Sequence, residues 1–289
     1  MTRQSVGLIG ATSLVGWRLT SLLAAAGDKT FAFSRKAGFT DTESVVWRQL
    51  CITPDTATEV LDKWICVAPI WVIPDLFPLL EAHGAKHIVA LSSTSRFTKR
   101  ESSDPKEQEV ARRLAQAEGV IQDWAAKRGV KLVVLRPTLI YGWGRDKNIA
   151  EIARFIRRFG FFPVLGKAEG LRQPIHADDV AAACLAALHS SKSDFQAYNI
   201  SGGETITYLE MVRRVFMAMG LSPRILTVPM WPFRVSVQVL QGVPRYRHWN
   251  VTMVERMNQD LTFDHSDAAA NLAFRPRAFH LMPEDLIIA

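Results

Sequence analysis

The sequence predicts an α/β fold in which helices cover both faces of a doubly wound parallel sheet. Short apolar runs alternate with segments of helical periodicity, and the connections between them are short. The first apolar run also leads through small residues directly into a helix. Buried strands of a parallel sheet form such continuous apolar runs because both of their faces are covered. These three observations favour a βαβ arrangement over an all-helical or all-strand fold.

The first of these units, residues 6–27, has the pattern of a phosphate-binding turn. The apolar run ends at Gly10, Gly16 follows at the start of a helix, and Gly27 closes that helix. Glycine lets backbone N–H groups approach a pyrophosphate, and the helix points the positive end of its dipole at the anion. Ser13 stands where a G-x-x-G-x-x-G spacing has its middle glycine. We therefore expect a Rossmann-type sheet whose cofactor contacts in this turn are Gly10, Thr12, Ser13, Leu14, Val15 and Gly16.

The second predicted strand, residues 29–33, ends in Ser34, Arg35 and Lys36. In a dinucleotide-binding fold this strand end lies beside the adenosine ribose, about 20 residues past the glycine turn. An acidic residue there would bind the ribose 2′-hydroxyl and favour NAD, whereas a hydroxyl and two cations suit a 2′-phosphate. The sequence therefore predicts NADP in preference to NAD. A solvated basic turn is the alternative interpretation.

Further elements follow in alternation along the chain. Strands are predicted over residues 44–50, 65–68, 87–91 and 131–135, and helices over residues 53–61, 74–83 and 105–128. Asp104 is a good N-cap for the last of these helices, and Gly129 is placed to end it. Two later helices are predicted, one capped near Thr207 and a short one over residues 268–272.

Length and charge limit the classes of protein that fit. The 289 residues are enough for one large domain with a smaller lobe, and 48% of them are hydrophobic. The formal net charge is +7, but the basic residues are spread along the chain. This distribution indicates solubility and attraction for an anionic small-molecule ligand, and we expect no nucleic-acid partner.

The cysteines and the apolar stretches indicate a cytoplasmic protein. Cys51, Cys66 and Cys184 are odd in number and lack metal-ligand spacing, so we expect reduced thiols and no metal. The first strand begins too early to leave room for a signal peptide. Prolines and charges interrupt the apolar stretches at residues 64–80 and 228–243, so no transmembrane segment is expected.

Six motifs in order give the chain a resemblance to a known family. They lie at residues 10–16, 91–94, 135–142, 174–181, 198–204 and 272–276. Together they resemble the extended and atypical short-chain dehydrogenase/reductases of the NAD-dependent epimerase/dehydratase type. The resemblance implies a nucleotide-binding domain of residues 1–142 plus 171–198. It implies a C-terminal substrate lobe of residues 143–170 plus 199–289.

The resemblance also assigns residues to the reaction site. The family uses the hydroxyl at the end of its fifth strand to bind the reacting carbonyl or hydroxyl, and Thr94 is the matching position. The residues after Arg136-Pro137 line the nicotinamide site in the family, so Thr138 and Leu139 are candidates there. The other implied cofactor contacts are Ala68, Pro69, Ser93 and Pro137. His176, within the fourth motif, is expected to pack or form a hydrogen bond and not to act as an acid or base.

The expected acid–base pair is missing. In the family, a tyrosine and a lysine four residues apart share one face of the long helix, and the lysine lowers the tyrosine pKa from about 10. When the register is counted back from Arg136, Glu118 matches a family glutamate, and Val110 and Leu114 replace the tyrosine and the lysine. The sequence contains no Tyr-x-x-x-Lys. The neighbouring ionisable residues that could approach the site are Lys99, Lys106, Glu107 and Glu109, although an exposed, charged helix start is the simpler interpretation.

Three residues in or next to the predicted lobe are candidates for binding the substrate. Arg172 resembles a family arginine that holds the diphosphate of a nucleotide sugar, and Arg245 supplies a second cation. Trp143 adds an aromatic surface on which a base could stack. A solvated face for the arginines and core packing for the tryptophan are the alternatives.

Two functions remain open on the sequence. The first is an NADP-dependent reductase or epimerase acting on a nucleotide sugar or related carbonyl compound, with its proton carried by Thr94 through water, by a substrate group or by a loop lysine. The second is a non-catalytic NADP-binding sensor, accessory subunit or scaffold, which Val110 and Leu114 favour. By analogy with the family, a homodimer is expected.

Overall fold

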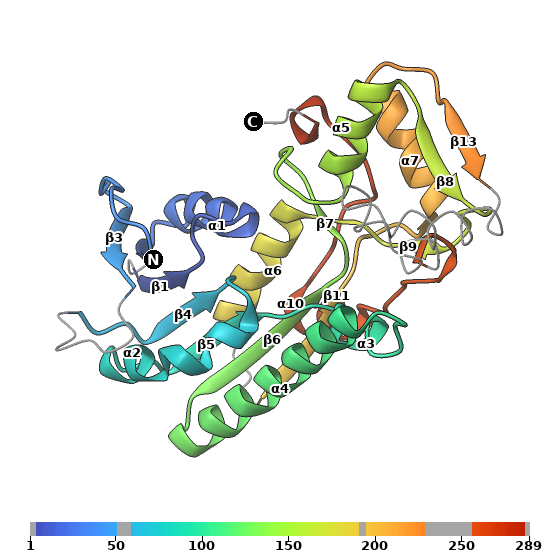
Figure 1. The fold of residues 1–289 in the computed structure, drawn as a ribbon. Helices are drawn as coiled ribbons and strands as arrows, with labels where there is room; N and C mark the ends of the chain where they lie inside the picture. Colours follow the sequence, from blue (N-terminus) through green and yellow to red (C-terminus); the bar gives the residue numbers. More distant parts are fainter. Residues whose placement is uncertain (1–3, 51–58, 191–194, 229–255, 287–289) are drawn as a thin grey trace.

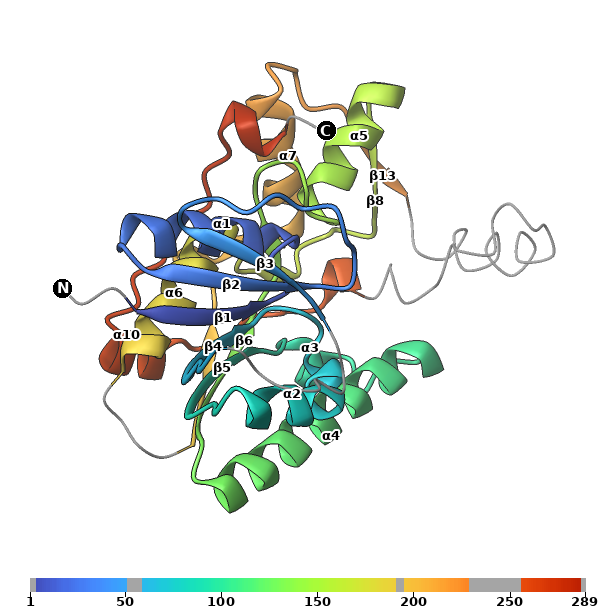
Figure 2. The same ribbon diagram turned by 90° about the vertical axis from the view of Figure 1, so that its left-hand side faces the viewer.

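The computed structural model describes residues 4–50, 59–190, 195–228 and 256–286 of the chain. Its centre is a seven-stranded sheet in the order β11-β6-β5-β4-β1-β2-β3, and every neighbouring pair is parallel (Figures 1 and 2). The strands are β1 Ser5–Ile9, β2 Lys29–Ser34, β3 Val45–Gln49, β4 Lys63–Cys66, β5 His87–Leu91, β6 Lys131–Pro137 and β11 Gln196–Ile200. The predicted Rossmann-type fold class is confirmed.

Helices cover both faces of this sheet. Helices α1 (Leu14–Ala25) and α6 (Ala177–His189) pack together on one face, and α2 (Phe77–Ala82) and α4 (Pro105–Arg128) lie on the other (Figure 2). Successive residues of a strand point to opposite faces, so one strand supplies both cores. In β4, Ile65 lies in the core under α1 and α6, whereas Trp64 lies in the core under α2 and α4. Both side chains are fully buried.

The long helix α4 has the predicted bounds because both ends are capped. A carboxylate oxygen of Asp104 accepts the N–H of Lys106 at 2.9 Å, and Gly129 ends the helix with a φ of 64°. The helix predicted over residues 74–83 begins instead as a 3₁₀ turn, η2 (Pro74–Leu76), before α2. The helix predicted over residues 53–61 falls mostly outside the described residues.

A smaller lobe lies beyond the carboxyl edge of the sheet. It contains α5 (Ile149–Phe159), α7 (Tyr208–Ala218) and the parallel pair β8 (Phe162–Leu165) and β13 (Ile225–Val228), at the upper right of Figure 1. These elements share their own apolar core. The Thr207 hydroxyl caps α7 by accepting the N–H of Glu210 at 3.1 Å, as the sequence predicts. Short paired strands connect the lobe to the sheet, namely β7 Ile140–Tyr141, β9 Leu171–Arg172, β10 Ile175–His176 and β12 Ile206–Thr207.

One helix of the C-terminal segment packs against the sheet and its covering helices. Helix α10 (Ser266–Leu272) lies against α6 and β11, and Ala268, Leu272 and Phe274 are buried in the core beneath α1 and α6. These apolar side chains pack the segment against the seven-stranded sheet, whereas the sequence predicts residues 199–289 as part of the lobe. The domain division stays a prediction.

Two cysteines occupy the sheet core. Cys66 and Cys184 are buried and free, and burial raises the pKa of each thiol to about 12. Cys51 lies outside the described residues. Within the described ranges, no three His, Cys, Asp or Glu side chains are placed to hold a metal ion. None of the helices described is both long enough and apolar enough to cross a membrane.

The close approach between β1 and α1 yields a stability prediction. A methyl group at Gly16 would lie 2.1 Å from the carbonyl oxygen of Gly10, so Gly16→Ala should lower the free energy of unfolding by about 1–3 kcal/mol. Gly119, inside α4, has no atom within 4 Å of such a methyl group. Gly119→Ala should therefore raise stability by about 1 kcal/mol. Urea unfolding measures both, and stabilisation by both substitutions would contradict the predicted packing.

Candidate functional site

The turn between β1 and α1 is built by two glycines and a serine. Gly10 has a φ of +91°, and a methyl group there would lie 2.7 Å from the backbone nitrogen of Ala68. The N–H of Ser13 donates to the Gly10 carbonyl at 2.9 Å, and its hydroxyl accepts the N–H of Gly16 at 3.0 Å. The serine that replaces the middle glycine is therefore the N-cap of α1. The cradle that these contacts leave suits the close approach of a pyrophosphate.

Other predicted cofactor residues lie along the same edge of the sheet. The strand order reverses between β1 and β4, which is where ligands bind in open α/β sheets. Val67 donates its N–H to Ile9 at 2.9 Å, so Ala68 and Pro69 follow β4 directly beside the glycine turn.

The basic strand end lies next to this turn. Residue Ile9 of β1 pairs with Phe33 of β2, so Ser34, Arg35 and Lys36 follow at the same edge of the sheet. The Ser34 hydroxyl accepts the N–H of Lys36 at 3.1 Å, and both basic side chains belong to exposed residues. Their charges are therefore accessible to an anionic ligand that reaches this end of the sheet.

A cavity of about 350 Å³ lies beside α4, beyond the ends of β4 and β5. Val110 and Leu114, one turn apart on α4, line it together with Ala68, Pro69 and Ser93. Val110 and Leu114 thus face this cavity from α4, and their match to the family's tyrosine and lysine positions stays a prediction. Among the described residues that line this cavity there is no ionisable side chain, and the polar side chains are Trp71 and the serines at positions 92, 93 and 95.

A buried carboxylate fixes α4 against the sheet. Glu118 is only 2% exposed, and it accepts hydrogen bonds from the Ser92 hydroxyl at 2.6 Å and from Arg136 Nη2 at 2.5 Å. It also forms an ion pair with Arg96 in the short helix α3 (Ser95–Thr98). One side chain thus ties together α3, α4 and the ends of β5 and β6. The sequence indicated Glu118 only as a family match, without these partners.

A larger cavity, of about 700 Å³, lies between the sheet edge and the lobe. Ser93, Thr94, Thr138 and Leu139 all line it, so the structure brings these predicted residues together. The Thr94 hydroxyl donates to the carbonyl oxygen of Pro137 at 3.1 Å, which orients it at the carboxyl end of β6.

Lys99 and Glu107 bring ionisable groups to this larger cavity. The Nζ of Lys99 lies 3.9 Å from a carboxylate oxygen of Glu107, which also pairs with Arg256. Burial and the charge of Arg256 lower the pKa of Lys99, and Asp104 opposes this shift. Lys106 and Glu109, the other two ionisable candidates, belong to exposed residues and do not line either cavity. Lys99 is thus an amine of weakened proton affinity at the cavity wall.

The three predicted substrate residues are not brought together. Arg172 lines the larger cavity, but its guanidinium donates to backbone carbonyls of Leu171 at 2.8 Å, Gln259 at 2.6 Å and Arg256. Trp143 lies away from this cavity, with its ring edge-on to Trp17 at 5.3 Å. The third residue, Arg245, lies outside the described residues.

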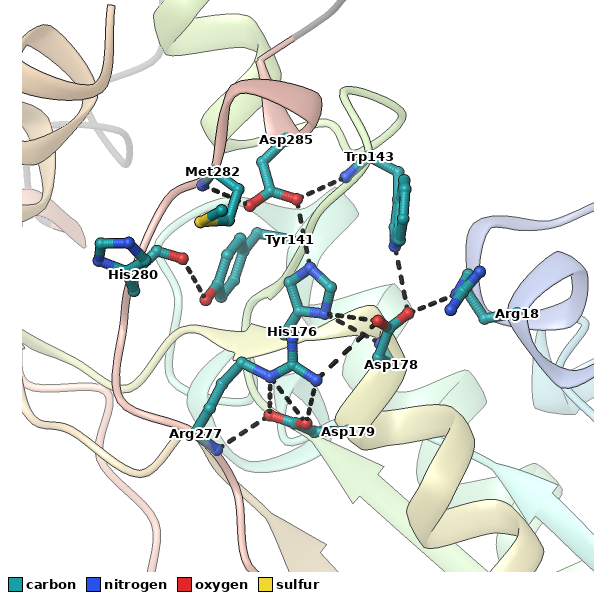
Figure 3. Close-up of polar contacts among 10 residues, drawn as sticks. All are labelled: Arg18, Tyr141, Trp143, His176, Asp178, Asp179, Arg277, His280, Met282 and Asp285. Atoms are coloured by element: carbon teal, nitrogen blue, oxygen red, sulfur yellow. Dashed lines mark hydrogen bonds and ion pairs between the residues drawn. The ribbon is translucent and has the colours of Figure 1, made fainter. Parts of the chain in front are cut away.

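Near Trp143, a hydrogen-bonded cluster joins the C-terminal segment to α6 (Figure 3). His176 Nε2 lies 3.2 Å from a carboxylate oxygen of Asp285, and its Nδ1 accepts the N–H of Asp178 at 3.2 Å. Asp285 also accepts the N–H groups of Trp143 and Met282, each at 3.0 Å. Burial alone would raise the pKa of Asp285, but hydrogen bonds from His176 and these N–H groups hold it below its usual value. The geometry gives His176 a hydrogen-bonding role.

The Glu118 contacts yield a second stability prediction. Glu118→Gln removes the charge but keeps the shape, and it leaves Arg136 and Arg96 without their buried partner. Breaking such a pair costs about 3–5 kcal/mol, so the free energy of unfolding should fall by that amount. The control is Glu109→Gln, because Glu109 is exposed and pairs with Arg112 at the helix surface. Equal urea midpoints for the two variants would contradict the role given to Glu118.

The middle of the chain matches a family model, and curated proteins share its sequence pattern. Residues 74–201 match the model of the NAD dependent epimerase/dehydratase family. An uncharacterised protein of Sinorhizobium fredii, y4nG, is 27% identical over 206 residues, which cover 68% of this chain and 50% of that protein. The UDP-glucose 4-epimerase of Vibrio cholerae is 22% identical over 162 residues, covering 56% of this chain and 47% of that enzyme. The chain thus spans about half the length of these relatives.

A third curated relative is named as a subunit of a larger protein complex. Subunit 9 of the NADH dehydrogenase [ubiquinone] 1 alpha subcomplex, a mitochondrial protein of Arabidopsis thaliana, is 25% identical over 118 residues. The match covers 40% of this chain and 29% of that protein.

Solved structures match nearly the whole chain. The UDP-N-acetylglucosamine 4-epimerase of Bacillus cereus superposes with a TM-score of 0.71 at 16% identity, covering 98% of this chain and 94% of that one. MoeE5, solved in complex with UDP-glucose and NAD, superposes with a TM-score of 0.68 at 19% identity, covering 98% of this chain and 96% of that one. At these identities the superpositions establish a shared fold. Residues 74–201 thus match the model of the NAD dependent epimerase/dehydratase family, and nearly the whole chain shares its fold with these solved structures.

Proposed function

We propose that this protein binds NADP and acts as a reductase or epimerase on a nucleotide sugar or a related carbonyl compound. The observation that carries the proposal is the meeting of two cavities at Ser93, at the carboxyl edge of the sheet. Ser93 and Ser95 line both the smaller cavity beside Val110 and the larger one beside Thr94. A nicotinamide in the first cavity would therefore lie next to a substrate in the second.

The size of the larger cavity and the known relatives support this substrate class. A volume of about 700 Å³ is within the range of small-molecule sites. The Vibrio cholerae relative is a UDP-glucose 4-epimerase, and MoeE5 was solved with UDP-glucose and NAD.

The preference for NADP over NAD rests on the end of β2. Ser34, Arg35 and Lys36 offer a hydroxyl and two exposed cations beside the glycine turn, where the adenosine ribose would lie. Gly10 and Gly16 leave no room for a side chain, which fits a turn that holds a pyrophosphate by its backbone. Arginine and lysine at the strand end would then bind the 2′-phosphate.

The chain's own residues would position the substrate and move its proton. The nicotinamide, when bound, would supply or take up the hydride. Thr94, with its hydroxyl held by the Pro137 carbonyl, would bind the reacting oxygen. The proton would pass through water at Thr94, through a substrate group or through Lys99, whose pKa is lowered by burial. In the last case the proton would come from a different element than in the family, because Lys99 follows α3 and does not lie on α4.

A second candidate function is a non-catalytic NADP-binding sensor, accessory subunit or scaffold. The specific observation in its favour is that Val110 and Leu114, which the resemblance matches to the family's acid–base pair, present apolar side chains to the smaller cavity. The likeness to a subunit of a mitochondrial NADH dehydrogenase adds a relative that is named as part of a larger assembly. Both candidate functions require binding of NADP, but only the first requires catalytic turnover of a substrate.

Binding of the two dinucleotides tests the shared part of the proposal. NADPH should bind the purified protein about tenfold or more tightly than NADH by titration calorimetry, because charge-assisted hydrogen bonds are each worth about 1.5–3 kcal/mol. The Arg35→Ala/Lys36→Ala variant should lose that preference and keep its affinity for NADH. Lys127→Ala, an exposed change at the far end of α4, is the control. Absence of affinity for either dinucleotide would remove both candidate functions.

Turnover tests the catalytic candidate. With a panel of UDP-sugars and 4-keto sugars, Thr94→Val and Lys99→Met should each lower kcat/KM by about 10²-fold or more without weakening NADPH binding. Lys99→Met should also remove the part of the pH dependence of kcat/KM that arises from titration of the Lys99 amine. Lys106→Met serves as the control because Lys106 lies outside both cavities. A protein that binds NADPH but turns over none of these compounds would support the accessory role instead.

A further inference from the structure

A loop segment at residues 142–146 places the guanidinium of Arg145 beside the glycine turn. This loop connects β7 to α5, and Arg145 extends from it toward the start of α1. The Nη2 of Arg145 donates to the carbonyl oxygen of Thr12 at 3.1 Å. Its guanidinium also lies 5.6 Å from the ring centroid of Trp17. A residue that follows the turn by 133 positions in the sequence thus touches it in the structure.

The loop is held in place from the C-terminal segment (Figure 3). Asp285 accepts the N–H of Trp143 with its carboxylate and the N–H of Gly144 with its backbone carbonyl, each at 3.0 Å. A methyl group at Gly142, which has a φ of +127°, would lie 2.7 Å from His176 Nε2. The indole N–H of Trp143 donates to Asp178 at 3.1 Å. These contacts fix the backbone on the N-terminal side of Arg145.

Arg18 and Arg145 differ in how their charges are compensated. Arg18, on the first turns of α1, pairs with Asp178 at 2.5 Å and lies under the Trp143 ring. Arg145 is exposed, and within the described parts of the chain it pairs with no carboxylate. The first turn of α1 contains no acidic residue. Of these two arginines, Arg145 is therefore the one whose charge no described carboxylate compensates.

We propose that Arg145 binds the pyrophosphate of the cofactor from the lobe side and that Asp285 is its positioning residue. The proposal rests on the proposed function, because the ligand is the dinucleotide expected at this turn. A guanidinium has five donors, so Arg145 can keep its bond to Thr12 and still offer a two-pronged contact to phosphate oxygens. NADPH and NADH share the pyrophosphate, so Arg145 should strengthen both equally and add nothing to the choice between them.

Calorimetric titration of Arg145→Gln tests this contact. The variant should bind NADPH and NADH each about tenfold or more weakly than the wild type, with an unchanged ratio between the two. Adenosine 2′-monophosphate, which lacks the pyrophosphate, should bind the variant and the wild type equally in a competition assay. Arg158→Gln removes the same charge from the exposed side of α5 and should change none of these affinities.

Two results would overturn the assignment of Arg145. The first is wild-type affinity of Arg145→Gln for both dinucleotides. The second is an equal loss for adenosine 2′-monophosphate, which would place the effect at the 2′-phosphate or in the overall charge. A wild-type protein that binds no dinucleotide would instead remove the proposed function itself, so the two failures are distinguishable.

A double-mutant cycle tests the positioning role of Asp285. Asp285→Asn should weaken NADPH binding in the wild-type background and have no further effect in the Arg145→Gln background. A merely structural role would weaken binding equally in both backgrounds and would contradict the proposal. Thermal unfolding of each variant verifies that it is folded at the assay temperature, and Arg145→Gln, an exposed substitution, tests the phosphate contact without disturbing the cluster around Asp285.

Discussion

The buried carboxylate of Glu118 is the interaction on which the geometry of the site depends. Its hydrogen bonds and ion pairs to Ser92, Arg96 and Arg136 hold the long helix against the carboxyl ends of β5 and β6. A buried charge is stable only with such partners, so the helix cannot rotate or slide without leaving it unpaired. That constraint helps to place Val110 and Leu114 on the wall of the smaller cavity.

Charged side chains lie at three places along the carboxyl edge of the sheet. Arg35 and Lys36 stand at the end of β2, where a 2′-phosphate would lie, and Arg145 reaches the glycine turn from the lobe. The larger cavity carries Lys99 and Glu107, which partly compensate each other. Accessible cations thus lie along the edge of the sheet where the proposed dinucleotide would bind. One of them, Arg145, belongs to the segment that leads into the lobe.

Local patterns in the sequence predicted the sheet and the long helix well. The apolar run at residues 87–91 coincides with β5, and Asp104 and Gly129 cap α4 as predicted, because these signals act within a few residues. The contact between Arg145 and Thr12 could not be predicted, since it joins segments that only the tertiary fold brings together. The role of Arg172 could not be predicted either. The sequence shows that this residue carries a charge, but only the fold shows that backbone carbonyls accept the hydrogen bonds of its guanidinium.

The most direct measurement of the central claim is a crystal structure of the protein with NADPH. The account predicts the pyrophosphate on the turn at residues 10–16, the 2′-phosphate against Arg35, and the nicotinamide between Ser93 and Val110. It also predicts that no side chain of α4 able to carry a proton lies beside the nicotinamide. A cofactor bound elsewhere on the sheet, or an ionisable group of α4 next to the ring, would contradict the account.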